Sequence, residues 1–142
     1  MKFINSFYNE EFKKSYVEVK HLGKIFEGTA CCHPEDTPSH FFGCYIAELR
    51  AEIKALKYER KIAKEEAEIC RKFCQSCLQY AKFDSEDASA KSMARQLSVK
   101  INKVNNLTAE INDRIMLIQR EILERKRFLD KVNKIKETVK NS

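Results

Sequence analysis

Residues 44–70 read CYIAELRAEIKALKYERKIAKEEAEIC, and this stretch decides the fold. Its apolar residues recur at alternating steps of three and four, as in Ile46, Leu49, Ile53 and Leu56. That spacing places them on one face of a helix and predicts a heptad seam. From Cys44 to Ser142 neither glycine nor proline occurs, so little interrupts a helix. We therefore expect long helices that pair through such seams.

The helical part of the sequence divides into two segments. We expect the first helix over residues 37–82, because Thr37 followed by Pro38 is typical of a helix start. A turn near Phe83, with Asp84 or Ser85 as the cap, leads into a second helix over residues 85–140. Helices of this length extend about 60 Å or more and cannot bury a core alone. The sequence predicts an antiparallel pair that forms a coiled-coil-like oligomer interface, as a homodimer or a higher homo-oligomer.

The N-terminal segment, residues 1–36, has a different pattern. Tyr16–Val19 and Ile25–Ala30 are rich in β-branched and aromatic residues, and Leu22 and Gly23 lie between them, so we predict a short β-hairpin. Residues 1 to about 15 are mixed and charged, which suggests an arm or a short helix. The expected fold class is α+β, predominantly α, in a single domain over residues 1–142.

Charge and hydropathy restrict the partners. The net charge of +6 and the pI near 9.0 permit an anionic partner, although the acidic residues are interspersed among the basic ones. Neither a signal peptide nor a run of ~20 apolar residues is visible, so we expect no membrane contact. The richness in Lys, Asn and Ile suggests a phage or an AT-rich bacterium, and we expect a location in the host cytoplasm with reduced thiols.

Six cysteines raise the question of a metal site. Cys70, Cys74 and Cys77 have the C-x3-C-x2-C spacing of radical SAM iron–sulfur sites, but all three fall on the helical seam, where packing is the favoured interpretation. A zinc site would use Cys31, Cys32, His33 and Cys44, which lack paired C-x2-C knuckles. We expect no metal, no cofactor and no catalytic residue.

Nucleic-acid binding is disfavoured. The cluster Arg125–Arg127 is basic, but Glu121, Glu124 and Asp130 interrupt it, so it lacks the continuous basic stripe of a duplex-binding helix. Cations near a helix C-terminus also stabilise the helix dipole, which gives a simpler explanation of the cluster.

Polar residues of the second helix interrupt its apolar pattern. Two interpretations remain open: they set the register of a partner helix, which the bare sequence favours, or they bind a small anionic ligand. Arginine forks match phosphates and aromatic rings stack on bases. The candidate ligand-binding residues are Phe83, Arg95, Asn105, Asn112 and Arg114.

Two motifs carry a resemblance to a known family. GTACCHPED, residues 28–36, and GCYIAELRA, residues 43–51, resemble a pattern of small phage proteins and are similar to the phage anti-Thoeris sponge family. The resemblance implies a non-enzymatic protein that sequesters a cyclic ADP-ribose immune signal made by host TIR enzymes. In that setting Arg114 or Arg95 would hold the pyrophosphate and Phe83 the adenine. The alternative is a coiled-coil phage protein that binds a host protein or nucleic acid.

Overall fold

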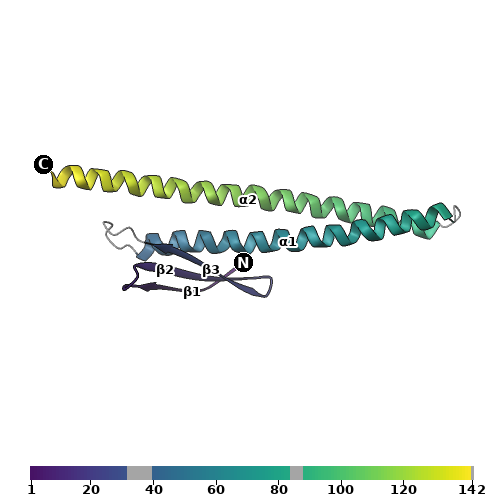
Figure 1. Cartoon of the computed structure of the whole chain (residues 1–142), viewed down its shortest axis with the longest axis horizontal. Helices are drawn as coiled ribbons and strands as arrows, with labels where there is room; N and C mark the ends of the chain where they lie inside the picture. Colours follow the sequence, from purple (N-terminus) through teal and green to yellow (C-terminus); the bar gives the residue numbers. More distant parts are fainter. Residues whose placement is uncertain (32–39, 84–87, 142) are drawn as a thin grey trace. The chain divides into compact units, whose positions relative to one another are not determined.

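The computed structural model describes residues 1–31, 40–83 and 88–141 of the chain. Three antiparallel strands come first: β1 (Lys2–Asn9), β2 (Lys14–His21) and β3 (Lys24–Cys31). The helices α1 (His40–Phe83) and α2 (Ala88–Lys140) follow (Figure 1). The predicted α+β class with two long helices is confirmed. Thr37, Pro38, Asp84 and Ser85, to which we assigned the helix starts, lie outside the described residues.

The sheet has the order β1-β2-β3, so the predicted hairpin is its β2–β3 half. The segment expected to be an arm or a short helix contributes β1, which pairs with β2 from Lys2 to Asn9 with a bulge between Phe3 and Asn5. Residues 1–7 are exposed. Because β1 is an edge strand with exposed side chains, its sequence lacks the strict alternation that identifies a half-buried strand.

Tight turns join the strands. Leu22 and Gly23 both have positive φ, of 51° and 77°, as a two-residue hairpin loop of the type I′ class requires. In the β1–β2 turn, the backbone N–H of Phe12 donates to Oδ1 of Asn9 over 3.2 Å, and Lys13 has a φ of 50°.

The sheet packs on the N-terminal part of α1 through β2 and β3. A β-carbon on Gly28 of β3 would overlap the backbone of Ala47 and Ala51 in α1. Glycine therefore permits a closer approach of strand and helix than any other residue would. Val17 and Val19 of β2 are buried beneath the sheet, with 1% and 2% of their surface exposed.

Hydrogen bonds fix the β3 edge of the sheet to α1. The Arg50 guanidinium donates to the carbonyl oxygen of Thr29, and the Lys54 ammonium donates to that of Glu27, each over 2.7 Å. Both acceptors belong to β3, which is an edge strand of this three-stranded sheet, and an edge strand leaves carbonyl groups open to side-chain donors.

The helical seams agree largely with the predicted spacing. Ile46, Leu49 and Leu56 of α1 are buried, whereas Ile53 is half-buried. Further along the same seam small side chains are buried: Ala63, Ala67, Cys70 and Cys74. On α2 the buried seam residues are Val104, Ile111, Ile115, Ile118 and Ile122.

Contacts divide the chain into two compact units. One unit, which we call the sheet-bearing unit, comprises residues 1–57 and 114–142, and the other, the helical unit, comprises residues 58–113. In the sheet-bearing unit the sheet lies on one side of α1 and α2 lies on the other (Figure 1). In the helical unit α1 and α2 run antiparallel, because Glu66 pairs with Lys100 while Cys74, further along α1, contacts Ala94.

Candidate functional site

An open hollow lies on α2 within the sheet-bearing unit. Its volume is about 460 Å³, and it is lined by Met116, Gln119, Arg120, Leu123, Glu124 and Arg127. We call it the arginine hollow. All six side chains are exposed, whereas Ile115, Ile118 and Ile122 on the other side of the helix are buried. The hollow therefore faces away from the core of its unit.

The spacing of the two arginines suits a phosphorylated ligand. Arg120 and Arg127 are seven residues apart, which places them on one side of the helix at a separation of about 10 Å. Guanidinium groups bind phosphate oxygens in pairs of hydrogen bonds. Met116 and Leu123 supply apolar surface beside them, and the Gln119 amide offers both a donor and an acceptor.

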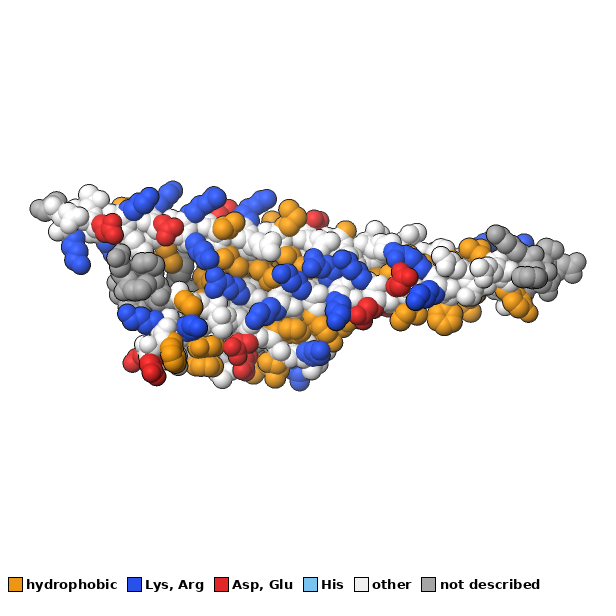
Figure 2. All heavy atoms as spheres, viewed as in Figure 1, with side chains coloured by type: hydrophobic (Ala, Val, Ile, Leu, Met, Phe, Trp, Pro, Cys, Tyr) orange, Lys and Arg blue, Asp and Glu red, His pale blue; other side chains and the backbone are white. Residues whose placement is uncertain are grey.

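Charge is concentrated in the same segment. Residues 114–142 contain nine Lys or Arg and four Asp or Glu, so they carry five of the six units of net positive charge. Figure 2 shows lysine and arginine side chains in blue along the helices, with fewer acidic side chains between them. Such a field raises the local concentration of an anionic ligand.

An apolar stripe runs beside the arginine hollow. Leu117, Phe128 and Ile135 are exposed by 60%, 59% and 64%, and they fall within about 20° of one another around the α2 axis. Exposed apolar side chains that line up on one helix face are typical of an interface with another chain. The oligomer interface that we expected of the paired helices stays a prediction.

A polar network joins α1 and α2 in the sheet-bearing unit. The Tyr45 hydroxyl donates to a carboxylate oxygen of Glu121, and the Arg125 guanidinium lies 5.0 Å from the centre of the Tyr45 ring. The hydrogen bond to Glu121 raises the pKa of Tyr45 above its usual value. Arg125, which interrupts the apolar pattern of the sequence, therefore has partners within its own chain.

Glu52 lies near this network. Burial raises the pKa of its carboxyl, and the negative charge of Glu48 raises it further, whereas Arg114 lowers it. Arg114 is exposed and lies close enough to Glu52 to affect its titration. Its predicted role as a phosphate-binding residue stays a prediction.

The other predicted ligand-binding residues lie apart from one another. Arg95 and Asn105 are exposed on α2, whereas Asn112 is half-buried and its amide oxygen accepts a hydrogen bond of 2.8 Å from the Arg60 guanidinium. Arg95 and Asn112 are 17 residues apart on one helix, which corresponds to about 25 Å. A single nucleotide cannot contact both within one chain. The Arg60 contact is also the kind expected of a register-setting pair.

Phe83 is the last residue of α1, and its side chain lies outside the described part of the structure. Its predicted stacking on a base stays a prediction.

The cysteine seam has no arrangement typical of a metal site. Cys70 and Cys74 are buried, and the Cys74 thiol lies 3.6 Å from both the carbonyl oxygen of Ala94 and the Ser98 hydroxyl. Within residues 1–31, 40–83 and 88–141, no group of three or more His, Cys, Asp or Glu side chains could hold a metal ion. Cys32 and His33, from the considered zinc set, lie outside the described residues.

Sequence reasoning missed the arginine hollow. It treated Arg127 as part of a basic cluster, and it gave Arg120 no role. The hollow could have been identified from two pairs of similar residues that are each seven positions apart: Arg120 with Arg127, and Met116 with Leu123.

Neither described helix contains a segment with the length and hydropathy needed to cross a membrane. No protein family, curated protein or solved structure matches the chain.

Proposed function

We propose that this protein is a non-enzymatic sponge that binds and sequesters a cyclic nucleotide of the cyclic ADP-ribose type, and so blocks a host antiviral defence. The arginine hollow is the observation that carries the proposal. It combines two arginines for phosphate oxygens with apolar and amide groups for the rest of the ligand, and its net charge is +1 because Glu124 offsets one of the two arginines. The resemblance of residues 28–36 and 43–51 to the anti-Thoeris sponge family supplies the class of ligand.

A second copy of the chain would close the hollow. Nanomolar capture corresponds to about 12 kcal/mol and needs a pocket that encloses most of a small ligand. Side chains of one helix cannot supply this enclosure. The apolar stripe of Leu117, Phe128 and Ile135 lies next to the hollow, so a copy that packs on this stripe would also cover the arginines.

The experiment separates capture from catalysis. The purified full-length protein is incubated with cyclic ADP-ribose and with its glycocyclic isomers, and unbound ligand is washed away. The protein is then denatured by heat, and the released compound is identified by mass spectrometry. We expect one of these compounds to be retained and released intact. A hydrolysed product would identify an enzyme, and the absence of retention for every isomer would refute sequestration.

The apolar stripe also favours a second candidate function, a coiled-coil protein that binds a host protein. Leu117, Phe128 and Ile135 would then form the contact with that partner. Sedimentation of the purified chain distinguishes the two. A dimer or a higher homo-oligomer is expected of the sponge, whereas a monomer that retains no nucleotide would favour the interaction protein.

A further inference from the structure

The inner face of β1, which is the face on the α1 side of the sheet, is partly exposed to solvent in the sheet-bearing unit. Phe3, Ser6 and Tyr8 of β1 lie opposite Val19, Val17 and Ser15 of β2, and opposite residues of an antiparallel pair share a face of the sheet. The three β2 side chains are buried against α1. Phe3, on the same face, is 51% exposed. The sheet therefore packs on α1 through β2 and β3, while β1 extends beyond the helix.

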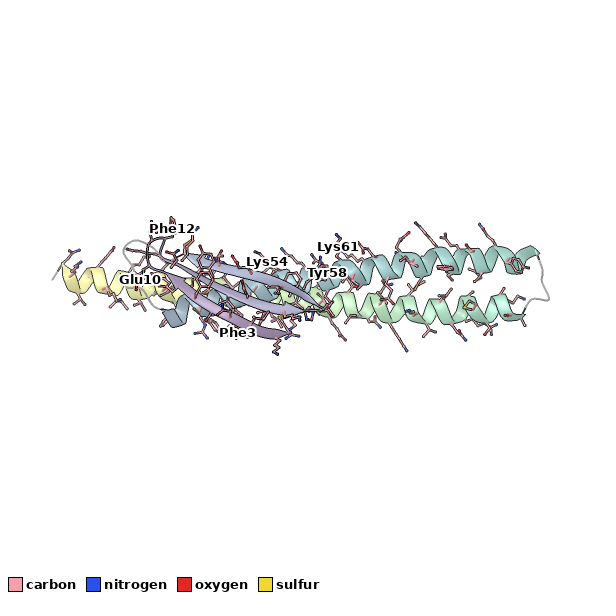
Figure 3. The ribbon with its side chains drawn as sticks, turned by 90° about the horizontal axis from the view of Figure 1, so that it is seen from below. Phe3, Glu10, Phe12, Lys54, Tyr58 and Lys61 are labelled. Carbon is pink, nitrogen blue, oxygen red and sulfur yellow. The ribbon has the colours of Figure 1, made fainter. Side chains whose placement is uncertain are left out.

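This overhang creates a second hollow, of about 550 Å³, which we call the aromatic hollow. β1 lines it with Phe3, Ser6, Phe7 and Tyr8, β2 with Val17, and α1 with Cys44, Tyr45 and Glu48. Its volume falls within the range of small-molecule sites. Figure 3 shows Phe3 on β1, away from Glu10 and Phe12 in the turn at the other end of the strand.

The chemistry of the aromatic hollow is opposite to that of the arginine hollow. Glu48 is the only Asp, Glu, Lys or Arg among the lining residues that the structure describes, and three aromatic residues line the hollow from the inner face of β1 and from α1: Phe3, Tyr8 and Tyr45. The faces of aromatic rings attract cations, and a carboxylate pairs with an ammonium group. The Tyr45 ring already has the Arg125 guanidinium at 5.0 Å from its centre.

The surroundings strengthen this preference for a cation. The charge of Glu48 contributes to the raised pKa of Glu52, so the two carboxyl groups lie close enough to interact, and Glu121 adds to the same effect. Arg114 and the N-terminal ammonium group oppose this negative field at Glu52, whereas Arg125 lies 4.0 Å from a carboxylate oxygen of Glu121. A phosphate entering the aromatic hollow would meet the Glu48 carboxylate, whereas an ammonium group would be attracted to it.

We infer that the aromatic hollow binds a small organic cation, an ammonium group carried on an apolar or aromatic body. Glu48 pairs with the ammonium group, and Phe3, Tyr8 and Tyr45 surround the body. The site is independent of the nucleotide capture proposed above, because its charge selects the opposite kind of ligand.

Calorimetry of the full-length protein tests this assignment with phenethylammonium and with the neutral phenethyl alcohol as probes. The unmodified protein is expected to bind the amine more tightly than the alcohol. Glu48→Gln keeps the size of the side chain and removes its charge, so it should weaken amine binding about tenfold or more and leave alcohol binding unchanged. The matched control Glu10→Gln removes a charge from the exposed β1–β2 turn and should change neither affinity.

A second variant fills the hollow from within. Ser6 is exposed and lines the hollow, so Ser6→Lys would place an ammonium group of the protein's own inside it at little risk to folding. Loss of amine binding in this variant supports the proposal. Equal affinity for amine and alcohol, or an unchanged affinity in Glu48→Gln, overturns it. Failure to bind amine, together with a dimer that Phe3→Glu dissociates, would show that a second copy of the chain occupies the hollow, and would also overturn the proposal.

Discussion

The arginine hollow on α2 presents two guanidinium groups on the outer side of a helix, whereas the aromatic hollow presents one carboxylate among rings under the edge of a sheet. Both belong to the sheet-bearing unit, and both are open. They differ in how they arise. Side chains of one helix form the first, so it depends on residue type and spacing alone. The second exists because β1 extends beyond the helix on which its neighbours pack, so it depends on the tertiary structure.

Charge removal should have the largest effect and should act on one hollow only. The double variant Arg120→Ala/Arg127→Ala removes both guanidinium groups that would bind the phosphates, and we expect nucleotide affinity to fall roughly 100-fold or more. Amine binding should be unchanged. Calorimetry measures both affinities, with circular dichroism to check helicity.

Lys126→Ala is the matched control for the arginine double variant. Lys126 is exposed on the same helix and does not line the hollow, so its loss removes a positive charge without removing a contact. The loss is compared with that of the single variants Arg120→Ala and Arg127→Ala. If Lys126→Ala weakens nucleotide binding as much as either of them, the general charge of α2 rather than the arginine hollow binds the ligand.

The tertiary origin of the aromatic hollow leads to the second prediction. In Gly28→Ala the new methyl group would overlap the backbone of Ala47 and Ala51, so the sheet must move away from α1. We expect the free energy of unfolding to fall by about 2–3 kcal/mol. Amine binding should be lost, while nucleotide binding to the arginine hollow remains.

Gly23→Ala provides the comparison for Gly28→Ala in denaturant unfolding. Gly23 has a φ of 77°, and a β-carbon there would meet nothing within 4 Å, so the variant carries backbone strain of only about 1 kcal/mol. Equal losses of stability in the two variants would contradict the close packing of β3 on α1.

Glu52 gives the smallest expected effect. Because burial and Glu48 raise its pKa, the folded state binds more protons than the unfolded state between pH 4.5 and the raised pKa, and stability falls as the pH rises through that interval. Glu52→Gln should therefore stabilise the protein at pH 7, by less than about 1 kcal/mol because solvent screens a half-exposed charge. Thermal melting should show this gain at pH 7 and no gain below pH 4. A variant less stable than the unmodified protein at pH 7 would contradict the negative field beside the aromatic hollow.

The same contrast explains what the sequence could predict. The spacing of Ile46, Leu49 and Leu56 predicts α1, because helical periodicity is a local property of the chain. The β1 strand was missed, since an edge strand with both faces exposed has no periodic signal. The aromatic hollow was missed for a further reason. Phe3 and Glu48 are brought together only when the sheet packs on the helix, and nothing in their spacing indicates this.

The predicted ligand-binding residues illustrate the same limit. Asn112 was chosen because a polar residue interrupts an apolar helix, but the interruption alone cannot distinguish a ligand contact from an internal one. Its partner, Arg60, lies on the other helix. The arginine hollow is a local pattern and could have been found by comparing positions seven residues apart.

Chemical-shift mapping by NMR tests the central claim, that two hollows of opposite charge lie in one unit of the chain. The isotope-labelled full-length protein is titrated first with cyclic ADP-ribose or its retained isomer and then with phenethylammonium. We predict two separate sets of perturbed amides, residues 116–127 for the nucleotide and residues 3–8 with 44–48 for the amine. The prediction would be contradicted if both ligands perturbed the same residues, or if neither set of residues were perturbed.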